Sequence, residues 1–492
     1  MSPETCRFHA VLRGHAERND GAIALWGDAM KMDYTSLFAE VAYRQERLRD
    51  EGVKVVALAL DNGVDAMLWD LAVLFEGLTC LTLPPFFSPA QRIHCLEQSH
   101  AERVIAEPYL EAELLAGGYR QSGDFWCRGF EGRPSMPSGT AKVTFTSGTT
   151  GTPKGVCLSA DSLLRVAREL HQASHITDPR HHLALLPIAI LLENLGCYAA
   201  LYAGATLSVP SQKSLGIQGA SAVDAAQLLG CLATRQPHSL ILVPQLLLML
   251  VIAAEQRAFS PQGLRFAAVG GARVSKALLQ RAHRLGMPVY EGYGLSECAS
   301  VVCLNAPGAQ RPGSVGRPLP HVEIRLAEDD EVLIKGSTLL GYLGQPGQPE
   351  QWWPTGDLGD FDADGFLYLK GRKKHQFVTS YGRNVNPDWV EAELTQDGVI
   401  AQAFVYGEAL PENHALLWPH RADCSDSQLA AAVAQANVGL PDYAQVHRWT
   451  RLAEPFTATN GLLTANGRPR RDAIVARYQA QLAPRLNEET SS

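Results

Sequence analysis

The residues best suited to chemistry lie in the stretch Val143-Thr-Phe-Thr-Ser-Gly-Thr-Thr-Gly-Thr-Pro-Lys-Gly-Val156. It begins as a short β-type run and continues as a loop of glycine, serine and threonine. Backbone N–H groups of such a loop can converge on an anion, and the hydroxyl groups add donors. Lys154 supplies a positive charge at the end of the loop. This inventory predicts a polyphosphate site, although a surface turn of the same composition is the plain alternative.

The loop is not a Walker A motif, because Lys154 precedes Gly155 instead of a serine or threonine. The whole stretch resembles the phosphate loop of the acyl-adenylate-forming superfamily, which includes acyl-coenzyme A synthetases, adenylation domains of peptide synthetases and luciferases. The resemblance implies that Lys154 is catalytic. It also implies that ATP and AMP contact Thr146, Ser147, Gly148, Thr149, Thr150, Gly151 and Lys154.

Two later segments resemble the part of the family that surrounds the adenine ring. The first is Gly270-Gly271-Ala272, and the second ends in Tyr293-Gly-Leu-Ser-Glu297. Tyr293 offers an aromatic face to a purine, and Glu297 offers an oxygen ligand to Mg²⁺. From the residues alone, the glycine pair is equally a tight turn and Glu297 a solvated side chain. By resemblance we expect Glu297 to be catalytic and to hold the metal, and we expect nucleotide contacts from Gly270, Gly271, Ala272, Tyr293, Gly294 and Ser296.

Thr355-Gly-Asp357 resembles the family motif whose aspartate binds the ribose. A carboxylate suits that role because its two oxygens can accept from two adjacent hydroxyl groups. An Asx turn at Asp357 is the structural alternative. Arg372 follows the strand expected at 365–371 and matches the family's second ribose contact.

At 492 residues the chain exceeds one hydrophobic core, so at least two domains are expected. Lys374 matches the family's hinge residue, which predicts an N-terminal AMP-binding domain over 1–373 and a C-terminal mobile domain over 374–492. An exposed, charged loop suits a hinge, although a plain basic linker has the same composition. The next loop resembles the segment that delivers the thiol acceptor, with Tyr381-Gly382 in place of the usual glycine pair.

Helix and strand signals alternate through the first part of the chain, which indicates parallel sheets covered by helices. The fold class we predict is α/β, with a large N-terminal domain of layered βα units and mostly parallel sheets. A small mobile C-terminal α+β domain follows. The expected helices include 34–49, 66–75, 91–99 and 161–173, the expected strands include 53–60, 80–83, 103–106 and 266–269, and a loop is expected at 117–141.

The composition excludes several kinds of partner. A formal net charge of −8 argues against nucleic acid or an anionic membrane surface. The longest apolar run, 240–254, is shorter than the about 18 residues of a membrane span and contains Pro244 and Gln245, so we expect a strand leading into a buried helix. No secretory signal is expected, and ten scattered cysteines without a CxxC pair indicate free thiols in a cytoplasmic protein.

The chain departs from the family near its end. Family members carry a lysine that reaches the α-phosphate and the substrate carboxylate during adenylation. The matching segment here is Asn460-Gly-Leu-Leu-Thr-Ala-Asn-Gly-Arg468, and the last lysine of the chain is Lys374. Arginine keeps the charge but is planar and more dispersed. We expect Arg468 to be the catalytic residue at this position. Two explanations for the arginine stay open: a general drift towards arginine, and an altered adenylation step.

The resemblance implies ATP-dependent activation of a small-molecule carboxylic acid, with Mg²⁺, followed by transfer to a thiol, coenzyme A or a carrier protein. A fatty acid is the expected substrate, because the 183–201 segment is apolar and resembles the long-chain branch, with Ile190 at the usual histidine position. Three alternatives stay open: a ligase that uses a carrier protein or an amine, a β-lactone-forming enzyme, and a catalytically weak nucleotide- or acyl-binding relative.

Overall fold

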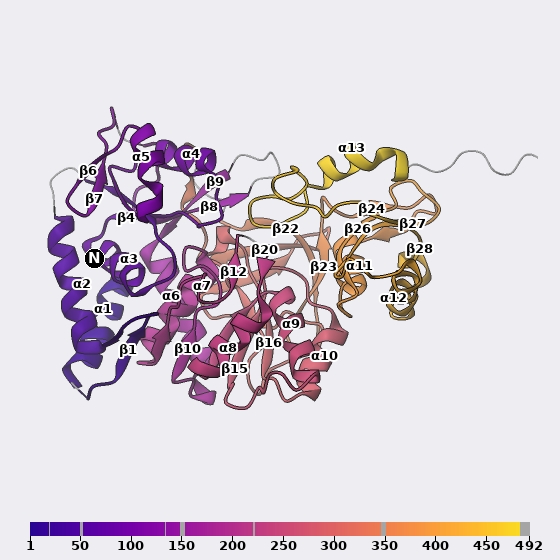
Figure 1. The fold of residues 1–492 in the computed structure, drawn as a ribbon, viewed down its shortest axis with the longest axis horizontal. Helices are drawn as coiled ribbons and strands as arrows, with labels where there is room; N and C mark the ends of the chain where they lie inside the picture. Colours follow the sequence, from indigo (N-terminus) through magenta and orange to yellow (C-terminus); the bar gives the residue numbers. More distant parts are fainter. Residues whose placement is uncertain are drawn as a thin grey trace, which may run out of the picture.

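The computed structural model describes residues 1–18, 20–49, 53–132, 134–147, 153–219, 222–345 and 351–482. Two large sheets alternate with layers of helices through most of the chain, and a small sheet with its own helices follows (Figure 1). The predicted α/β fold class is confirmed.

The first sheet has nine strands in the order β18-β17-β16-β15-β14-β10-β11-β1-β2. Neighbours from β16 to β1 are parallel, and the pairs at both edges are antiparallel. The bounds are β1 (Ile23–Trp26), β2 (Lys31–Asp33), β10 (His181–Leu183), β11 (Thr206–Ser208), β14 (Ser239–Leu242), β15 (Phe266–Val269), β16 (Val289–Tyr293), β17 (Cys303–Leu304) and β18 (Arg317–Pro318).

The second sheet has eight strands in the order β21-β9-β8-β4-β3-β5-β7-β6, parallel only from β8 to β5. Its strands are β3 (Val55–Ala59), β4 (Thr79–Thr82), β5 (Arg103–Ala106), β6 (Arg120–Ser122), β7 (Phe125–Cys127), β8 (Thr140–Ser147), β9 (Pro153–Ser159) and β21 (Gly341–Tyr342). The loop predicted at 117–141 is wrong over β6 and β7, because Phe125 and Trp126 are buried and pair this hairpin with the sheet edge.

Helices form three layers around these sheets. Between the sheets lie α1 (Pro3–Arg18), α2 (Tyr34–Leu48), α3 (Val64–Glu76), α6 (Ala160–Ser174) and α7 (Leu191–Tyr202), whose apolar side chains join both sheets in one cluster. The outer face of the nine-stranded sheet carries α8 (Ala225–Arg235), α9 (Pro244–Glu255) and α10 (Lys276–Arg284). The outer face of the eight-stranded sheet carries α4 (Pro89–Ser99) and α5 (Glu111–Ala116).

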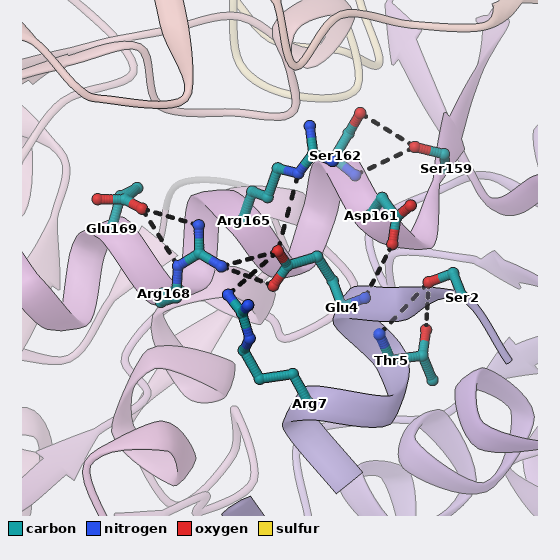
Figure 2. A network of polar contacts seen from close by, with 10 residues as sticks. All are labelled: Ser2, Glu4, Thr5, Arg7, Ser159, Asp161, Ser162, Arg165, Arg168 and Glu169. Atoms are coloured by element: carbon teal, nitrogen blue, oxygen red, sulfur yellow. Dashed lines mark hydrogen bonds and ion pairs between the residues drawn. The ribbon is translucent and has the colours of Figure 1, made fainter. Parts of the chain in front are cut away.

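The helix α1 was not predicted, and ion pairs fasten it to α6 (Figure 2). The carboxylate of Glu4 accepts from Arg168 Nη1 at 2.7 and 2.8 Å and also lies near Arg7 and Arg165. Asp161, at the start of α6, accepts from the backbone N–H of Glu4. Since α6 follows β9 directly, this clamp fixes the far end of the strand that carries Lys154.

A third sheet is wholly antiparallel, in the order β19-β20-β22-β23. Its strands are β19 (Val322–Leu326), β20 (Glu331–Gly336), β22 (Trp353–Phe361) and β23 (Leu367–Arg372). Further short elements of this part of the chain are β12 (Ile217–Gln218), β13 (Ala222–Val223), η1 (Pro108–Leu110), η2 (His175–Thr177) and η3 (Ser296–Cys298).

The C-terminal unit is built around the sheet β26-β27-β28. It comprises β24 (Phe377–Val378), β25 (Asn384–Val385), α11 (Pro387–Leu394), β26 (Ile400–Tyr406), β27 (Asn413–Pro419), α12 (Asp426–Val438), η4 (Asp442–Ala444), β28 (Val446–Arg451) and α13 (Arg471–Leu482). Helices α11 and α12 cover one face and α13 the other, in two apolar clusters drawn only from residues 377–482. This separate core fits the division we propose between 1–373 and 374–492.

The described part of the chain contains no helix with the length and apolar character needed to cross a bilayer.

A buried ion pair links the central layers. The ammonium of Lys142 on β8 lies 2.7 Å from Asp70 on α3 and donates to Asn194 Oδ1 of α7 at 2.6 Å. Asn194 and Tyr198 donate to the second oxygen of Asp70. Burial alone would raise the pKa of Asp70, but Lys142 and these hydrogen bonds hold it below its ordinary value.

Replacing Lys142 should therefore lower the free energy of unfolding. Lys142→Met leaves Asp70 as a buried charge without a cation, and we expect the free energy of unfolding to fall by about 3–5 kcal/mol in denaturant titrations. Lys335→Met is the matched control, since Lys335 pairs with Glu323 at the surface and should change stability by less than about 1 kcal/mol. Equal effects of the two substitutions would contradict this interpretation.

Candidate functional site

The candidate site is centred on the carboxylate of Asp357. Asp357 on β22 stands opposite Arg372 on β23 in the strand register, and Arg372 Nε lies 2.8 Å from Oδ1. Tyr293, the last residue of β16, donates its hydroxyl hydrogen to Oδ2 at 2.6 Å. Asp357 is 5% exposed. Burial raises the pKa of Asp357, and Arg372 and Tyr293 oppose that rise.

The backbone before Asp357 is held by its own hydrogen bonds. Thr355 Oγ1 donates to the carbonyl of Val332 at 2.8 Å and accepts from the N–H of Asp357 at 3.0 Å. Gly356 has φ +71°, a left-handed conformation that glycine adopts without strain. The carboxylate therefore bonds across strands and does not close the Asx turn that the sequence alone allowed.

The loop after β16 carries Glu297 on the single turn η3. A Cβ at Gly294 would lie 1.4 Å from the carbonyl oxygen of Ser300, so only glycine fits there. Ala299 and Ser300 have positive φ of 52° and 82°, and such strain is concentrated at functional sites. Glu297 is half-buried, and its Oε1 accepts from the hydroxyl group of Tyr342 at 3.1 Å. Ser296 is also half-buried on the same turn.

The turn Gly270-Gly271-Ala272 follows β15 and passes close to β16. A Cβ at Gly270 would lie 3.2 Å from the carbonyl oxygen of Gly292, and Gly271 has φ +82°. Gly271 and Ala272 are exposed. The tight turn expected from the residues is therefore present, and it lies beside the strand that ends in Tyr293.

Lys154 lies on β9, which pairs with β8 as an antiparallel hairpin. Thr146 and Lys154 face each other in that register, as do Ser147 and Pro153. Gly148, Thr149, Thr150 and Gly151 lie outside the described residues. The ammonium of Lys154 is 5.9 Å from the ring centroid of Tyr342, so Tyr342 stands between Lys154 and Glu297. A cavity of about 160 Å³ is lined by Lys154, Tyr342, His94, Gln98 and Gln345, among others.

Arg468 approaches this site from the C-terminal unit. Its turn is closed by backbone bonds from Thr464 to Arg468 and from Gly467 to Thr464, and Leu463 bridges Pro469. Burial and the neighbouring Arg372 lower the pKa of Arg468, while Glu297 and Asp357 raise it. The residue nevertheless keeps exposed surface. Arg468 therefore lies within electrostatic range of Asp357, Arg372 and Glu297.

Contacts between the two parts of the chain hold this arrangement. Ser275 and Arg281, at the two ends of α10, both donate to Gln396 just after α11, at 2.9 and 2.7 Å. Arg273 donates to the carbonyl of Leu369 and lies over the ring of Trp389. These contacts explain why Arg468, although far along the sequence, lies near Asp357.

Lys374 lies in a turn closed by the N–H groups of His375 and Gln376, which donate to the carbonyl of Arg372. The residue is exposed. Burial of its ammonium group and Arg372 lower the pKa of Lys374, and Arg468 acts in the same direction. The turn is the connection between β23 and the C-terminal unit, and its role as a hinge stays a prediction.

The sequence patterns did not point to Tyr342, Arg273 or Glu291. Tyr342 and Arg273 carry no local signal, because their partners Glu297 and Trp389 are distant in sequence. Glu291 lies between Tyr290 and Gly292 in a strand. A charged residue inside such an apolar run is a signal that the sequence alone offers.

Comparisons with known proteins identify the family of this chain. The sequence profile of the family described as AMP-binding enzyme matches residues 12–343, and that of the AMP-binding enzyme C-terminal domain matches residues 374–486. The chain belongs to the AMP-binding enzyme family. This confirms the predicted membership in the acyl-adenylate-forming superfamily.

Two curated relatives and one solved structure illustrate the range of proteins to which this chain is similar. A long-chain-fatty-acid–CoA ligase of Mycobacterium bovis is 28% identical over 71% of this chain and 70% of its own length. A 2-succinylbenzoate–CoA ligase of Bacillus licheniformis is 27% identical over 80% of this chain and 86% of its own length. The structure of O-succinylbenzoate coenzyme A synthetase from Bacillus subtilis with ATP and magnesium ion has a TM-score of 0.73 and 22% identity, covering 94% of this chain and 98% of that one.

Glu291 gives a pH-dependent prediction. Burial raises its pKa from 4.5 to about 7, although Arg273 lowers it. A folded-state pKa above the unfolded value means that the protonated form stabilises the fold, fully below about pH 4.5 and no longer above about pH 7. Relative to wild type, Glu291→Gln should therefore gain about 1–3 kcal/mol of unfolding free energy as the pH rises through that window.

Denaturant titrations across this pH range measure the effect. Glu323→Gln is the control, because Glu323 is exposed on β19 and should follow wild type. A Glu291→Gln variant whose stability tracks wild type at every pH would show that Glu291 does not titrate abnormally.

Proposed function

We propose that this protein uses ATP to convert a carboxylic acid to acyl-AMP and then transfers the acyl group to the thiol of coenzyme A. The observation that carries the proposal is the convergence of Asp357, Glu297 and Arg468 from three distant segments and from both parts of the chain. These are the residues that the family resemblance assigned to ribose, metal and α-phosphate.

In the first step the substrate carboxylate attacks the α-phosphorus of ATP, and pyrophosphate leaves with the electron pair of the broken P–O bond. Asp357 can accept from the ribose hydroxyl groups, because each oxygen keeps a lone pair beyond those used by Tyr293 and Arg372. Arg468 stabilises charge at the α-phosphate and Lys154 the departing pyrophosphate. Positioning of the two reactants supplies most of the remaining rate.

The residues present fit a magnesium ion. Glu297 offers a half-buried carboxylate, and the described residues contain no cluster of three acidic, histidine or cysteine side chains. Mg²⁺ binds through one or two carboxylates together with substrate phosphates, so Glu297 would hold it with ATP supplying the other ligands. When bound, the ion neutralises charge on the phosphate oxygens.

In the second step the thiol sulfur attacks the acyl carbonyl, AMP leaves, and a thioester forms. Tyr381, at the tip of the β24–β25 hairpin, is 76% exposed and available to an incoming acceptor. Both curated relatives described above carry coenzyme A ligase names, which supports coenzyme A as the acceptor. Rotation at Lys374 would bring this hairpin to the site, as in the family.

A fatty acid is the substrate class we propose. Residues 182–189 are buried, and Asn62 holds their backbone by donating to the carbonyl of Leu186 and accepting from the N–H of Ile188. This apolar wall suits an alkyl chain, and the mycobacterial relative has a long-chain name. The second candidate is an aromatic acid, because the 2-succinylbenzoate ligase matches over more of its own length.

One panel experiment tests the function and its alternatives. Pyrophosphate release is measured with alkanoic acids of several lengths and with aromatic acids, each with coenzyme A, a carrier protein, an amine or no acceptor. We expect ATP- and acid-dependent release with thioester formation from coenzyme A. Release without acyl-coenzyme A would favour a carrier-protein thioester, an amide or a β-lactone as the product. Binding of ATP without release from any acid would indicate a catalytically weak relative.

Asp357 provides a direct test of the nucleotide site. Asp357→Ala removes a charge-assisted ribose contact worth about 1.5–3 kcal/mol, so ATP should bind roughly 10- to 150-fold more weakly in calorimetry. Asp360→Ala is the matched control on the same strand, since Asp360 is exposed and pairs only loosely with Lys370. Unchanged ATP affinity in a folded Asp357→Ala protein would remove Asp357 from the site.

Arg468 gives a prediction about the first step alone. A lysine ammonium is a point charge, whereas a guanidinium must place a planar fork in the same gap, and a displacement of about 1 Å can cost on the order of 100-fold in rate. We therefore expect Arg468→Lys to speed acyl-AMP formation and to leave thioester formation from supplied acyl-AMP unchanged. Half-reaction assays measure both steps.

The outcomes of that assay are distinct. If Arg468→Lys abolishes acyl-AMP formation, the arginine is an adapted catalytic residue. If Arg468→Ala matches wild type in both steps, the position carries no chemistry.

A further inference from the structure

We propose that Arg471 is a positioning residue whose anchor on Glu391 and Asp388 sets where Arg468 lies in the candidate site. The inference rests on the proposed function for its kinetic consequences, because Arg468 is assigned to acyl-AMP formation. The anchor itself is a structural claim that can be tested without any substrate.

One guanidinium makes all the contacts of the anchor. Arg471 Nη1 lies 2.9 Å from Glu391 Oε1 and 3.6 Å from Asp388 Oδ1, both on α11. Arg471 Nη2 donates to the carbonyl of Val405 on β26 at 2.6 Å. The guanidinium also lies over the ring of Phe404, 4.4 Å from its centroid. A planar donor fork presents its N–H groups in fixed directions, so one guanidinium can hold several partners in a defined geometry.

The anchor is largely buried. The side chains of Arg471 and Glu391 are 16% and 13% exposed, and Glu391 also accepts from the N–H of Val405. Burial raises the pKa of Glu391 to about 7, and Arg471 opposes this rise. Without Arg471 the carboxyl group can become neutral by taking up a proton, so its removal need not unfold the domain.

A short and stiff connection joins the anchor to Arg468. Pro469 fixes its own backbone angle φ and is bridged to Leu463, and the N–H of Arg470 donates to the carbonyl of Leu462 at 2.9 Å. Arg471 then begins α13. The turn that carries Arg468 is thus tied at its root to α11.

Asp388 connects the same anchor to the segment that leaves Arg372. Its Oδ2 lies 3.1 Å from His375 Nδ1, and His375 follows Lys374. A single carboxylate therefore holds both the base of the Arg468 turn and the start of the C-terminal unit. This explains how Arg468 is placed near Asp357 although, among the described residues, its guanidinium makes no hydrogen bond to the large domain.

Hydrogen exchange tests the anchor with the full-length protein alone. In Arg471→Ala, the amides of residues 463–468 should exchange at least about tenfold faster than in wild type, while those of the β26–β28 sheet stay unchanged. Arg477→Ala is the matched control, because Arg477 lies on the same helix and pairs with Glu454 at the surface. Unchanged exchange at 463–468 in Arg471→Ala overturns the proposal.

A double-mutant cycle tests the positioning role. Arg471→Ala should lower the rate of acyl-AMP formation by about 10- to 100-fold with the KM for ATP unchanged, since Asp357 and Arg372 are untouched. In an Arg468→Ala background the same change should cost less than about threefold, because Arg471 acts through Arg468. Arg471→Lys, which keeps the charge next to Glu391, should lose less than Arg471→Ala.

The outcomes separate this inference from the proposed function. Equal losses from Arg471→Ala in both backgrounds, or a loss confined to thioester formation, overturn the positioning role. If wild type forms acyl-AMP from no acid, the proposed function fails, and the exchange measurement alone decides whether the anchor exists.

Discussion

The site depends on two partners that satisfy one buried carboxylate, that of Asp357. Asp357 belongs to the antiparallel sheet, Arg372 to the next strand of that sheet, and Tyr293 to the end of a parallel strand in the nine-stranded sheet. An unpaired carboxylate at this depth would be costly, so the two sheets must meet where these partners meet. Because Arg372 ends β23, the same pair fixes the direction in which the chain leaves the large domain.

Positive charge around this carboxylate is supplied mainly by arginine. Arg372 is shared with Asp357, so its charge is partly committed, and Arg468 brings a second guanidinium to the same place. Burial lowers the pKa of Arg468, and repulsion between its charge and that of Arg372 lowers it further. A polyphosphate would relieve that repulsion, so the binding of an anion and the approach of Arg468 should support each other.

Local patterns predicted much of the fold and little of its long-range pairing. Buried apolar runs gave Phe266–Val269 and Arg103–Ala106 with their observed bounds, because a strand covered on both faces is apolar throughout. The helix α1 was missed because Phe8, Leu12 and Ala16 are too few to stand out among polar neighbours. Motif resemblance named Asp357 but could not reveal that Tyr293 would bond to it.

The apolar wall at residues 182–189 keeps its backbone in place through a buried glutamate. Glu193 is 0% exposed, accepts from the N–H of Leu186 and lies 3.0 Å from His182 Nε2. Its role is to hold the backbone of the wall, which any change to an apolar residue would release. Ile190, at the histidine position, is half-buried, and its side chain has no polar group that could hold the backbone. The buried charge of Glu193 therefore supports the backbone, and an apolar side chain at position 190 leaves that support intact.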